Sequence, residues 1–167
     1  MIPIHSFFSR YSSLPNTRIR IGLVMVAMTG FLLSYAAHAQ PSGKLLNLQL
    51  ETTLVPSPAS VDVLLPPGYE QFNDPIPLFI WLHGGSSGEG HLENRMQPYI
   101  EKAWASGSLT PCVVVTPVTG SSYYMDWHDG TNQWAAFITG KMLEYVRKHH
   151  NVRQDRAGTV IGGASAG

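Results

Sequence analysis

The sequence contains little cysteine, little charge and no long hydrophobic run. Cys112 is the only cysteine of the 167 residues, which excludes an internal disulfide, and its position in an apolar run predicts a buried, unreactive thiol. Charged residues make up 13% of the chain and hydrophobic residues 44%, a balance typical of a globular protein and not of a disordered one. The sequence has no basic patch that would indicate binding to nucleic acid. It also lacks an uninterrupted run of the about 20 apolar residues that a transmembrane helix needs.

The net charge of zero hides an uneven distribution along the chain. Arg10, Arg18 and Arg20 precede the first acidic residue, whereas the chain from Gln40 onward has eight basic and eleven acidic side chains, a net charge of −3. An apolar run at 21–33 and a small-x-small sequence at 37–39 follow the arginines. This order is typical of a signal peptide, residues 1–39, and predicts a secreted or periplasmic protein without stable membrane association after cleavage. The alternative is an uncleaved anchor, although the run is short for one.

Residues 40–167 show strand and helix patterns in alternation and are enough for one domain. The first two predicted strands form an antiparallel hairpin at the edge of a sheet, and the other three are buried on both faces. The five predicted strands are 45–53, 60–65, 78–82, 112–118 and 159–161. After the first two strands, strands and helices alternate along the chain. This order predicts an α/β fold with a mostly parallel sheet.

Two segments have the periodicity of amphipathic helices. The first runs from about 92 to 106, buries a face that includes Tyr99, and ends at Gly107. The second begins after Asn132, a residue suited to an N-cap, and ends near His149 and His150. Because these two histidines are adjacent, they cannot share a helix face as metal ligands, and no other metal or cofactor site is expected.

The pattern G-x-S-x-G occurs at 163–167, directly after the predicted strand 159–161. At a sharp turn between a strand and a helix this pattern lifts the serine, here Ser165, out of the sheet. Glycines two residues before and after it allow close approach of the backbone. The exposed hydroxyl can then attack a carbonyl carbon, while the first amides of the following helix face the developing oxyanion. An ordinary turn of small residues, in which Ser165 has no catalytic role, fits the same pattern.

Four further features occur in a characteristic order: VDVLLPPGY at 61–69, LFIWLHGG at 78–85, SSYYMDW at 121–127, and the approach to the serine at 155–167. Together they resemble the esterase D-like family of the α/β-hydrolase superfamily. This family includes secreted feruloyl and acetyl-xylan esterases, S-formylglutathione hydrolases and mycolyltransferases. The resemblance covers 61–167 and implies the N-terminal part of an α/β-hydrolase fold, truncated at the turn that carries the nucleophile. Residues 40–167 would then be a partial α/β-hydrolase domain.

The resemblance also implies roles for particular residues. Ser165 would be the nucleophile, and the backbone amides of Gly85 and Ala166 would donate to the oxyanion, each worth about 3 kcal/mol of transition-state stabilisation. Trp127 would line the substrate cleft, although a loop tryptophan packed on the domain fits the sequence equally well. In this superfamily the acid and the histidine base follow the serine, so no histidine of this chain is expected to be the base. The chain as it stands is therefore expected to be an inactive fragment.

The leading hypothesis is an exported serine esterase that hydrolyses a carboxylic ester through an acyl-enzyme at Ser165, without a cofactor. Its substrate would be a small ester or one linked to a polysaccharide, and it would not bind nucleic acid. One alternative is an acyltransferase to a sugar hydroxyl, because the loop 121–127 is similar to that of the mycolyltransferases. The other is a non-catalytic binding module. A phosphate-binding loop is not expected, because the glycine-rich stretch 86–90 lacks the Gly-Lys-Ser/Thr ending.

Overall fold

The computed structural model describes residues 42–85, 88 and 90–167. The expected signal peptide, residues 1–39, lies outside the described residues, and so do residues 86, 87 and 89 of the glycine-rich stretch. In the part of the chain that is described, no helix is both long enough and apolar enough to cross a membrane.

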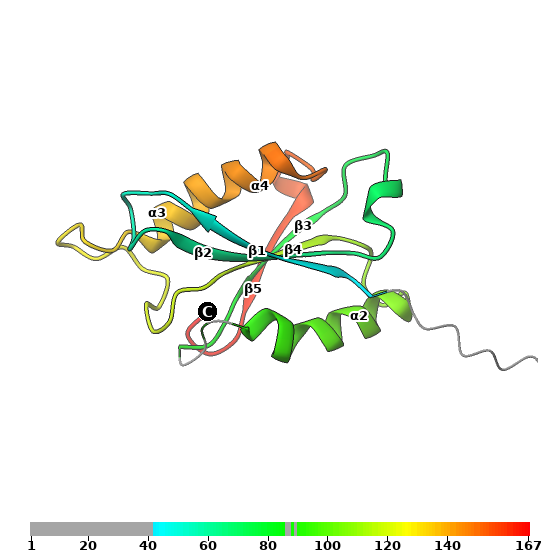
Figure 1. The fold of residues 1–167 in the computed structure, drawn as a ribbon, viewed down its shortest axis with the longest axis horizontal. Helices are drawn as coiled ribbons and strands as arrows, with labels where there is room; N and C mark the ends of the chain where they lie inside the picture. The colour runs from blue at the N-terminus through cyan, green and yellow to red at the C-terminus, as the bar shows by residue number, and fades with distance from the viewer. Residues whose placement is uncertain (1–41, 86–87, 89) are drawn as a thin grey trace, which may run out of the picture. The chain divides into compact units, whose positions relative to one another are not determined.

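One sheet of five strands forms the centre of the fold, in the order β1-β2-β4-β3-β5 (Figure 1). The strands are β1 (Lys44–Leu50), β2 (Ala59–Leu65), β3 (Leu78–Leu82), β4 (Val113–Pro117) and β5 (Thr159–Gly163). β2 pairs antiparallel with both β1 and β4, whereas β3 pairs parallel with both β4 and β5. The predicted α/β fold with an antiparallel hairpin at one edge is confirmed. Because β4, β3 and β5 are parallel, their carboxyl ends lie at the same edge of the sheet.

Helices cover both faces of the sheet (Figure 1). On one face lie a short π-helical turn, η2 (Leu92–Met96), and α2 (Gln97–Ala105). On the other lies a nearly continuous helical segment made of α3 (Trp134–Phe137), the π-helical turn η3 (Ile138–Met142) and α4 (Leu143–His149). Two 3-10 turns, η1 (Tyr69–Gln71) and η4 (Arg156–Gly158), complete the elements. Both predicted helices are confirmed, and Gly107, with φ of 72°, follows the end of the first.

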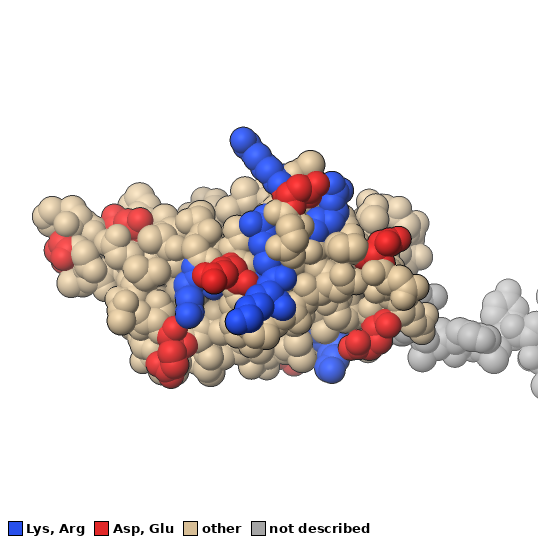
Figure 2. Space-filling view, turned by 90° about the horizontal axis from the view of Figure 1, so that it is seen from above, with Lys and Arg blue, Asp and Glu red and all other residues tan. Residues whose placement is uncertain are grey.

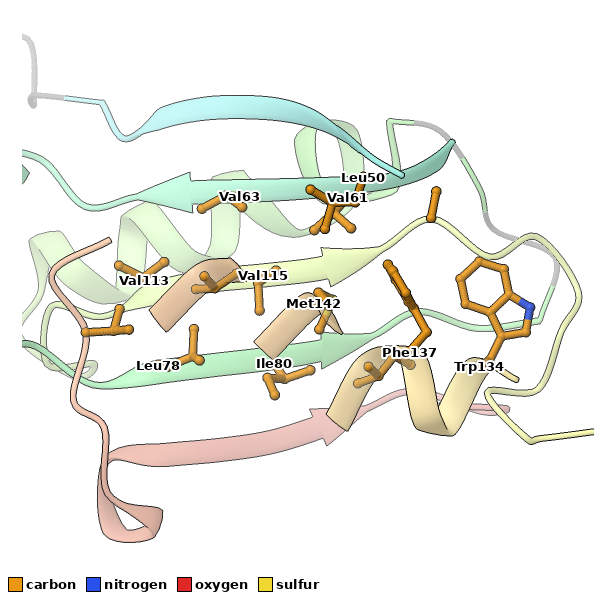
Figure 3. Packing of buried hydrophobic residues seen from close by; sticks show 14 of the residues in the cluster. Leu50, Val61, Val63, Leu78, Ile80, Val113, Val115, Trp134, Phe137 and Met142 are labelled. Atoms are coloured by element: carbon orange, nitrogen blue, oxygen red, sulfur yellow. The ribbon is translucent and has the colours of Figure 1, made fainter. Parts of the chain in front are cut away.

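Alternation of side chains along the strands divides the core into two layers. Val61 and Val63 of β2 face the larger cluster, beneath the α3–α4 segment, whereas Leu64 faces the cluster beneath α2. Figure 3 shows the larger cluster, in which Phe137 and Met142 of the helical segment pack on the strands. Each apolar side chain buried in this way contributes about 1.5–3 kcal/mol to folding. The two layers hold the central strands, and with them the loops at their carboxyl ends.

Cys112 is buried in the cluster beneath α2, as predicted from its apolar run. Burial raises the pKa of its thiol. The thiol is therefore kept in its neutral, weakly nucleophilic form.

Two expectations about the helices are wrong. Tyr99 does not pack on the sheet but is 73% exposed, so the buried face of α2 is narrower than its apolar pattern indicates. Asn132 is not the N-cap of α3: Gln133 occupies that position without a side-chain cap. The carboxylate of Asp126 instead accepts a hydrogen bond from the amide of Ala136 at 3.1 Å and satisfies one free donor of the first turn.

The expectation that 159–161 forms a strand buried on both faces is also wrong for this chain. β5 lies at the edge of the sheet and pairs only with β3 among the described strands. Val160 and Ile161 are 55% and 59% exposed. The strand itself and its parallel pairing, from Leu78–Thr159 to Leu82–Gly163, are as predicted.

The face that carries α4 bears charges of both signs, and Figure 2 shows Lys and Arg side chains lying among Asp and Glu side chains. Arg153 and Asp155 form an ion pair of 2.6 Å next to η4. Both side chains are largely exposed, so water screens their attraction and the pair adds little to stability.

Candidate active site

The carboxyl ends of β3, β4 and β5 lead into three segments at one edge of the sheet. They begin at residues 83, 118 and 164, directly after the three strands. Figure 1 shows the end of the chain beside the segment that follows β3, and the amide of Ala164 donates a hydrogen bond to the carbonyl oxygen of Leu82 at 3.1 Å. In open α/β sheets, ligands bind at the carboxyl ends of the strands. A ligand site is therefore expected at this edge.

Ser165 lies on a tight turn directly after β5, with a left-handed backbone φ of 57°. The turn is closed by a hydrogen bond from the amide of Gly167 to the carbonyl oxygen of Ala164, at 3.1 Å. A left-handed conformation costs a residue with a Cβ atom roughly 1–2 kcal/mol, and such strain is concentrated at functional sites. The side chain of Ser165 is exposed, so its hydroxyl is accessible from solvent.

The glycines on either side of Ser165 are required by close contact with β3. A Cβ atom added to Gly163 would lie 2.7 Å from the carbonyl oxygen of Leu82 and 2.5 Å from the carbonyl carbon of Gly167. One added to Gly167 would overlap the carbonyl oxygen of Leu82 and lie 2.6 Å from its Cβ. Distances below 3.0 Å to backbone atoms cannot be relieved by a side-chain rotation. The turn therefore packs directly against the end of β3, and neither Gly163 nor Gly167 has room for a side chain.

The predicted oxyanion residues lie next to this turn. A Cβ atom added to Gly84 would lie 3.7 Å from the Cβ of Ser165, and one added to Gly85 would lie 3.4 Å from the Cβ of Ala166. The structure thus brings Ser165, Ala166 and Gly85 together, although Gly85 and Ser165 are 80 positions apart. Residues with little or no side chain, at 84, 85 and 166, therefore lie beside the exposed Ser165.

His83 fixes the orientation of the peptide that contains the Gly85 amide. Its side chain is fully buried, and its Nε2 accepts a hydrogen bond from the amide of Thr119 at 3.3 Å. The ring proton is then on Nδ1, which donates to the carbonyl oxygen of Gly84 at 2.9 Å. In a trans peptide the carbonyl and the following N–H point in opposite directions, so the amide of Gly85 points away from the histidine.

Trp127, predicted to line the cleft, is 48% exposed in the segment after β4. Its backbone is held in a local turn, with its amide donating to Asn132 and its carbonyl accepting from the side chain of Gln133. The aromatic ring beside Gly85 belongs instead to Tyr123, which the sequence reasoning did not single out. The available signal was topological: β4 neighbours β3, so the segment after β4 lies beside residues 83–85.

In the described part of the chain, no group of three or more His, Cys, Asp or Glu side chains is arranged to hold a metal ion. The chemistry that this edge offers through its own groups is a hydroxyl on a strained turn and a set of backbone N–H donors. Such an arrangement suits attack on a carbonyl carbon and stabilisation of the oxyanion that forms.

Comparison with known families agrees with this chemistry. Residues 53–167 match the model of the family described as "Putative esterase". The chain belongs to this esterase family. The match includes all three segments at the carboxyl edge, and it confirms the resemblance to the esterase D-like enzymes.

Solved structures of esterases and related hydrolases share the fold. A ferulic acid esterase matches with a TM-score of 0.63 and 23% identity, over 75% of this chain and 49% of that one. A fluorophosphonate-binding serine hydrolase of Staphylococcus aureus matches with 0.62 and 21%, over 75% and 48%. An S-formylglutathione hydrolase of Agrobacterium tumefaciens matches with 0.59 and 20%, over 77% and 50%. This esterase chain thus spans about half the length of the structures it matches, and at these identities the likeness establishes the α/β-hydrolase fold.

Proposed function

We propose that this esterase uses Ser165 as the nucleophile that attacks a carboxylic ester and forms an acyl-enzyme, with the amides of Gly85 and Ala166 as oxyanion donors. The observation that carries the proposal is the left-handed φ of 57° at Ser165, on a turn packed beside residues 84 and 85. A non-catalytic turn has no need of a strained serine where glycine would fit. The fluorophosphonate-binding serine hydrolase among the structural matches supports the assignment.

Attack requires a base, and in this superfamily the acid and the histidine follow the serine in the chain. The only fully buried histidine among the described residues, His83, uses both ring nitrogens in hydrogen bonds that hold residues 84 and 119. We therefore assign it to positioning and not to proton transfer.

The substrate that we propose is an ester outside the cytoplasm, either small or linked to a polysaccharide. The ferulic acid esterase among the matches supports an ester of this kind. Export itself rests on the sequence of residues 1–39, and N-terminal sequencing of the protein recovered outside the cytoplasm tests it. The expected first residue is Gln40, and a start at Met1 would contradict the assignment.

The nucleophile is tested by labelling the native protein with a fluorophosphonate probe and locating the label by mass spectrometry. We expect the label on Ser165, its loss in Ser165→Ala, and its retention in Ser121→Ala, which removes an exposed serine without a strained backbone. Hydrolysis of 4-nitrophenyl acetate should follow the same pattern. If the native protein is not labelled, or if Ser165→Ala is labelled as well as the native protein, the proposal fails.

An acyltransferase is the second candidate, because Trp127 presents an exposed ring on the segment after β4. Flat aromatic rings bind the apolar faces of sugars, and a bound sugar hydroxyl would accept the acyl group in place of water. Product analysis of the native protein with an aryl ester, with and without added sugar, distinguishes the two. A sugar ester as the main product would favour transfer, and free acid alone would favour hydrolysis.

A further inference from the structure

The segment after β4 contains two consecutive residues in a strained conformation. Tyr123 and Tyr124 have φ values of 55° and 57°, and with Ser165 they are the non-glycine residues with positive φ in the described part of the chain. Left-handed backbone at a bulky residue persists only where the surroundings hold it in place. Both strained tyrosines lie at the edge of the sheet that carries Ser165.

Tyr124 anchors this segment to the start of the oxyanion corner. Its side chain is buried, and its hydroxyl donates a hydrogen bond to the carbonyl oxygen of His83 at 2.9 Å. Burial raises the pKa of Tyr124 to about 12, so the hydroxyl keeps the proton that this bond requires. The Oγ of Ser122 accepts from the amide of Tyr124 at 3.3 Å and holds the backbone from the other side.

The anchoring of Tyr124 leaves Tyr123 on the solvent side of the corner. Tyr123 is 61% exposed, an unusual state for an aromatic side chain held on a strained backbone. Its Cε1 and Cζ atoms lie 3.9 Å and 4.0 Å from the position of a Cβ atom added to Gly85. The same position lies 3.4 Å from the Cβ of Ala166. The ring therefore lies beside Gly85, one of the two proposed oxyanion donors, and much of its surface is open to solvent.

We propose that Tyr123 is a specificity-determining residue of this esterase. Its ring forms one wall of the space in front of the amides of Gly85 and Ala166, and a flat apolar group of the ester packs against it. The inference rests on the proposed function, because it concerns the substrate of the same site. It differs from the sequence expectation, which gave the wall to Trp127. Aromatic rings bind flat apolar groups in stacked or edge-on contact, in addition to the benefit of burial.

The test compares 4-nitrophenyl benzoate with 4-nitrophenyl acetate, which share a leaving group and differ in the acyl group. Tyr123→Gly removes the ring, and glycine accepts a φ of 55° without strain, so this variant should fold. Tyr123→Phe keeps the ring. Tyr99→Ala is the matched control, since Tyr99 is 73% exposed on α2 and has no part in the site. Circular dichroism and thermal melting verify the fold of each variant.

We expect Tyr123→Gly to lower the ratio of kcat/KM for benzoate to that for acetate by about fivefold to tenfold. Tyr123→Phe should change the ratio by less than about twofold, and Tyr99→Ala should leave it unchanged. An equal loss on both esters would show a merely structural role, and an unchanged ratio would show no contact. Either result overturns the proposal.

A binding measurement separates this proposal from the proposed function. In a Ser165→Ala background no acyl-enzyme can form, and the affinity for methyl benzoate is measured by NMR titration with and without Tyr123→Gly. Weaker binding without the ring supports the assignment of Tyr123 even if the native protein shows no Ser165-dependent hydrolysis, a result that would overturn only the proposed function. Equal affinity with and without the ring overturns the role of Tyr123.

Discussion

The strain at Ser165 predicts that removing its side chain altogether makes the protein more stable. With φ at 57°, a residue that has a Cβ atom is disfavoured by roughly 1–2 kcal/mol, and glycine avoids this cost. Glycine also gains freedom in the unfolded chain, which offsets roughly 0.4–1 kcal/mol of that benefit. Ser165→Gly should therefore exceed Ser165→Ala in stability by about 0.5–1 kcal/mol. For a domain of this size the difference corresponds to about 2–4 °C in Tm.

The assay is thermal and urea unfolding of the purified protein, with Ser165→Ala as the reference because it keeps the Cβ atom and therefore the strain. Ser121→Gly is the matched control: Ser121 is exposed and does not have a positive φ, so the same change should destabilise the protein by about 0.4–1 kcal/mol. If Ser165→Gly is no more stable than Ser165→Ala, the argument from backbone strain is refuted. The same holds if Ser121→Gly is stabilised equally. If Ser165→Gly is more stable than Ser165→Ala and has no activity, the serine at this position lowers stability but is needed for function.

Three further changes test other parts of the structure. Gly163→Ala should destabilise the protein by about 1–3 kcal/mol and abolish labelling of the serine, because the added methyl would lie 2.7 Å from the carbonyl oxygen of Leu82; urea unfolding and fluorophosphonate labelling measure the two effects. Asp126→Ala should lower stability by about 1 kcal/mol, since α3 loses the carboxylate that caps it, and an equally stable variant would contradict that role. The pKa of Asp155 is lowered by its hydrogen bond from Arg153, so the ionised form is favoured in the folded state. Wild type should therefore exceed Asp155→Asn in stability above the ordinary pKa of 3.8, and this advantage should disappear as the pH falls through the lowered pKa, as followed by thermal melting between pH 2 and 7.

Hydrophobic pattern was sufficient to predict the strands and the order of the elements. The apolar run 78–82 is β3 without any change of bounds, because a strand covered on both faces must be apolar throughout. The family resemblance, confirmed by the match over 53–167, rests on short motifs at the ends of these strands. The expected proximity of Gly85 to Ser165 came from that resemblance, and the structure accounts for it by the parallel order of the strands, which places their carboxyl ends at one edge.

The errors arose where the environment of a residue depends on how the chain folds around it and not on its own type or spacing. Asn132 is a suitable cap by its type, but the first turn of α3 is satisfied by Asp126, which a turn of the preceding loop brings within reach. Tyr99 fits the helical period of the apolar residues but is exposed, because the sequence does not determine how wide a face of α2 is buried. The position of Tyr123 depends on two left-handed residues in succession, a conformation that tyrosine does not favour and that its sequence does not predict.

The parallel arrangement of β3, β4 and β5 has a consequence for how enzymes of this kind diverge. The segments that approach Ser165 leave the sheet at one edge, while the two buried layers lie on its faces. Insertions in the segment 118–133 would reshape the approach to the hydroxyl without altering the registry of the central strands. The same fold can therefore acquire new ester preferences through a change in the length of one surface loop, while the position of the Ser165 hydroxyl stays the same.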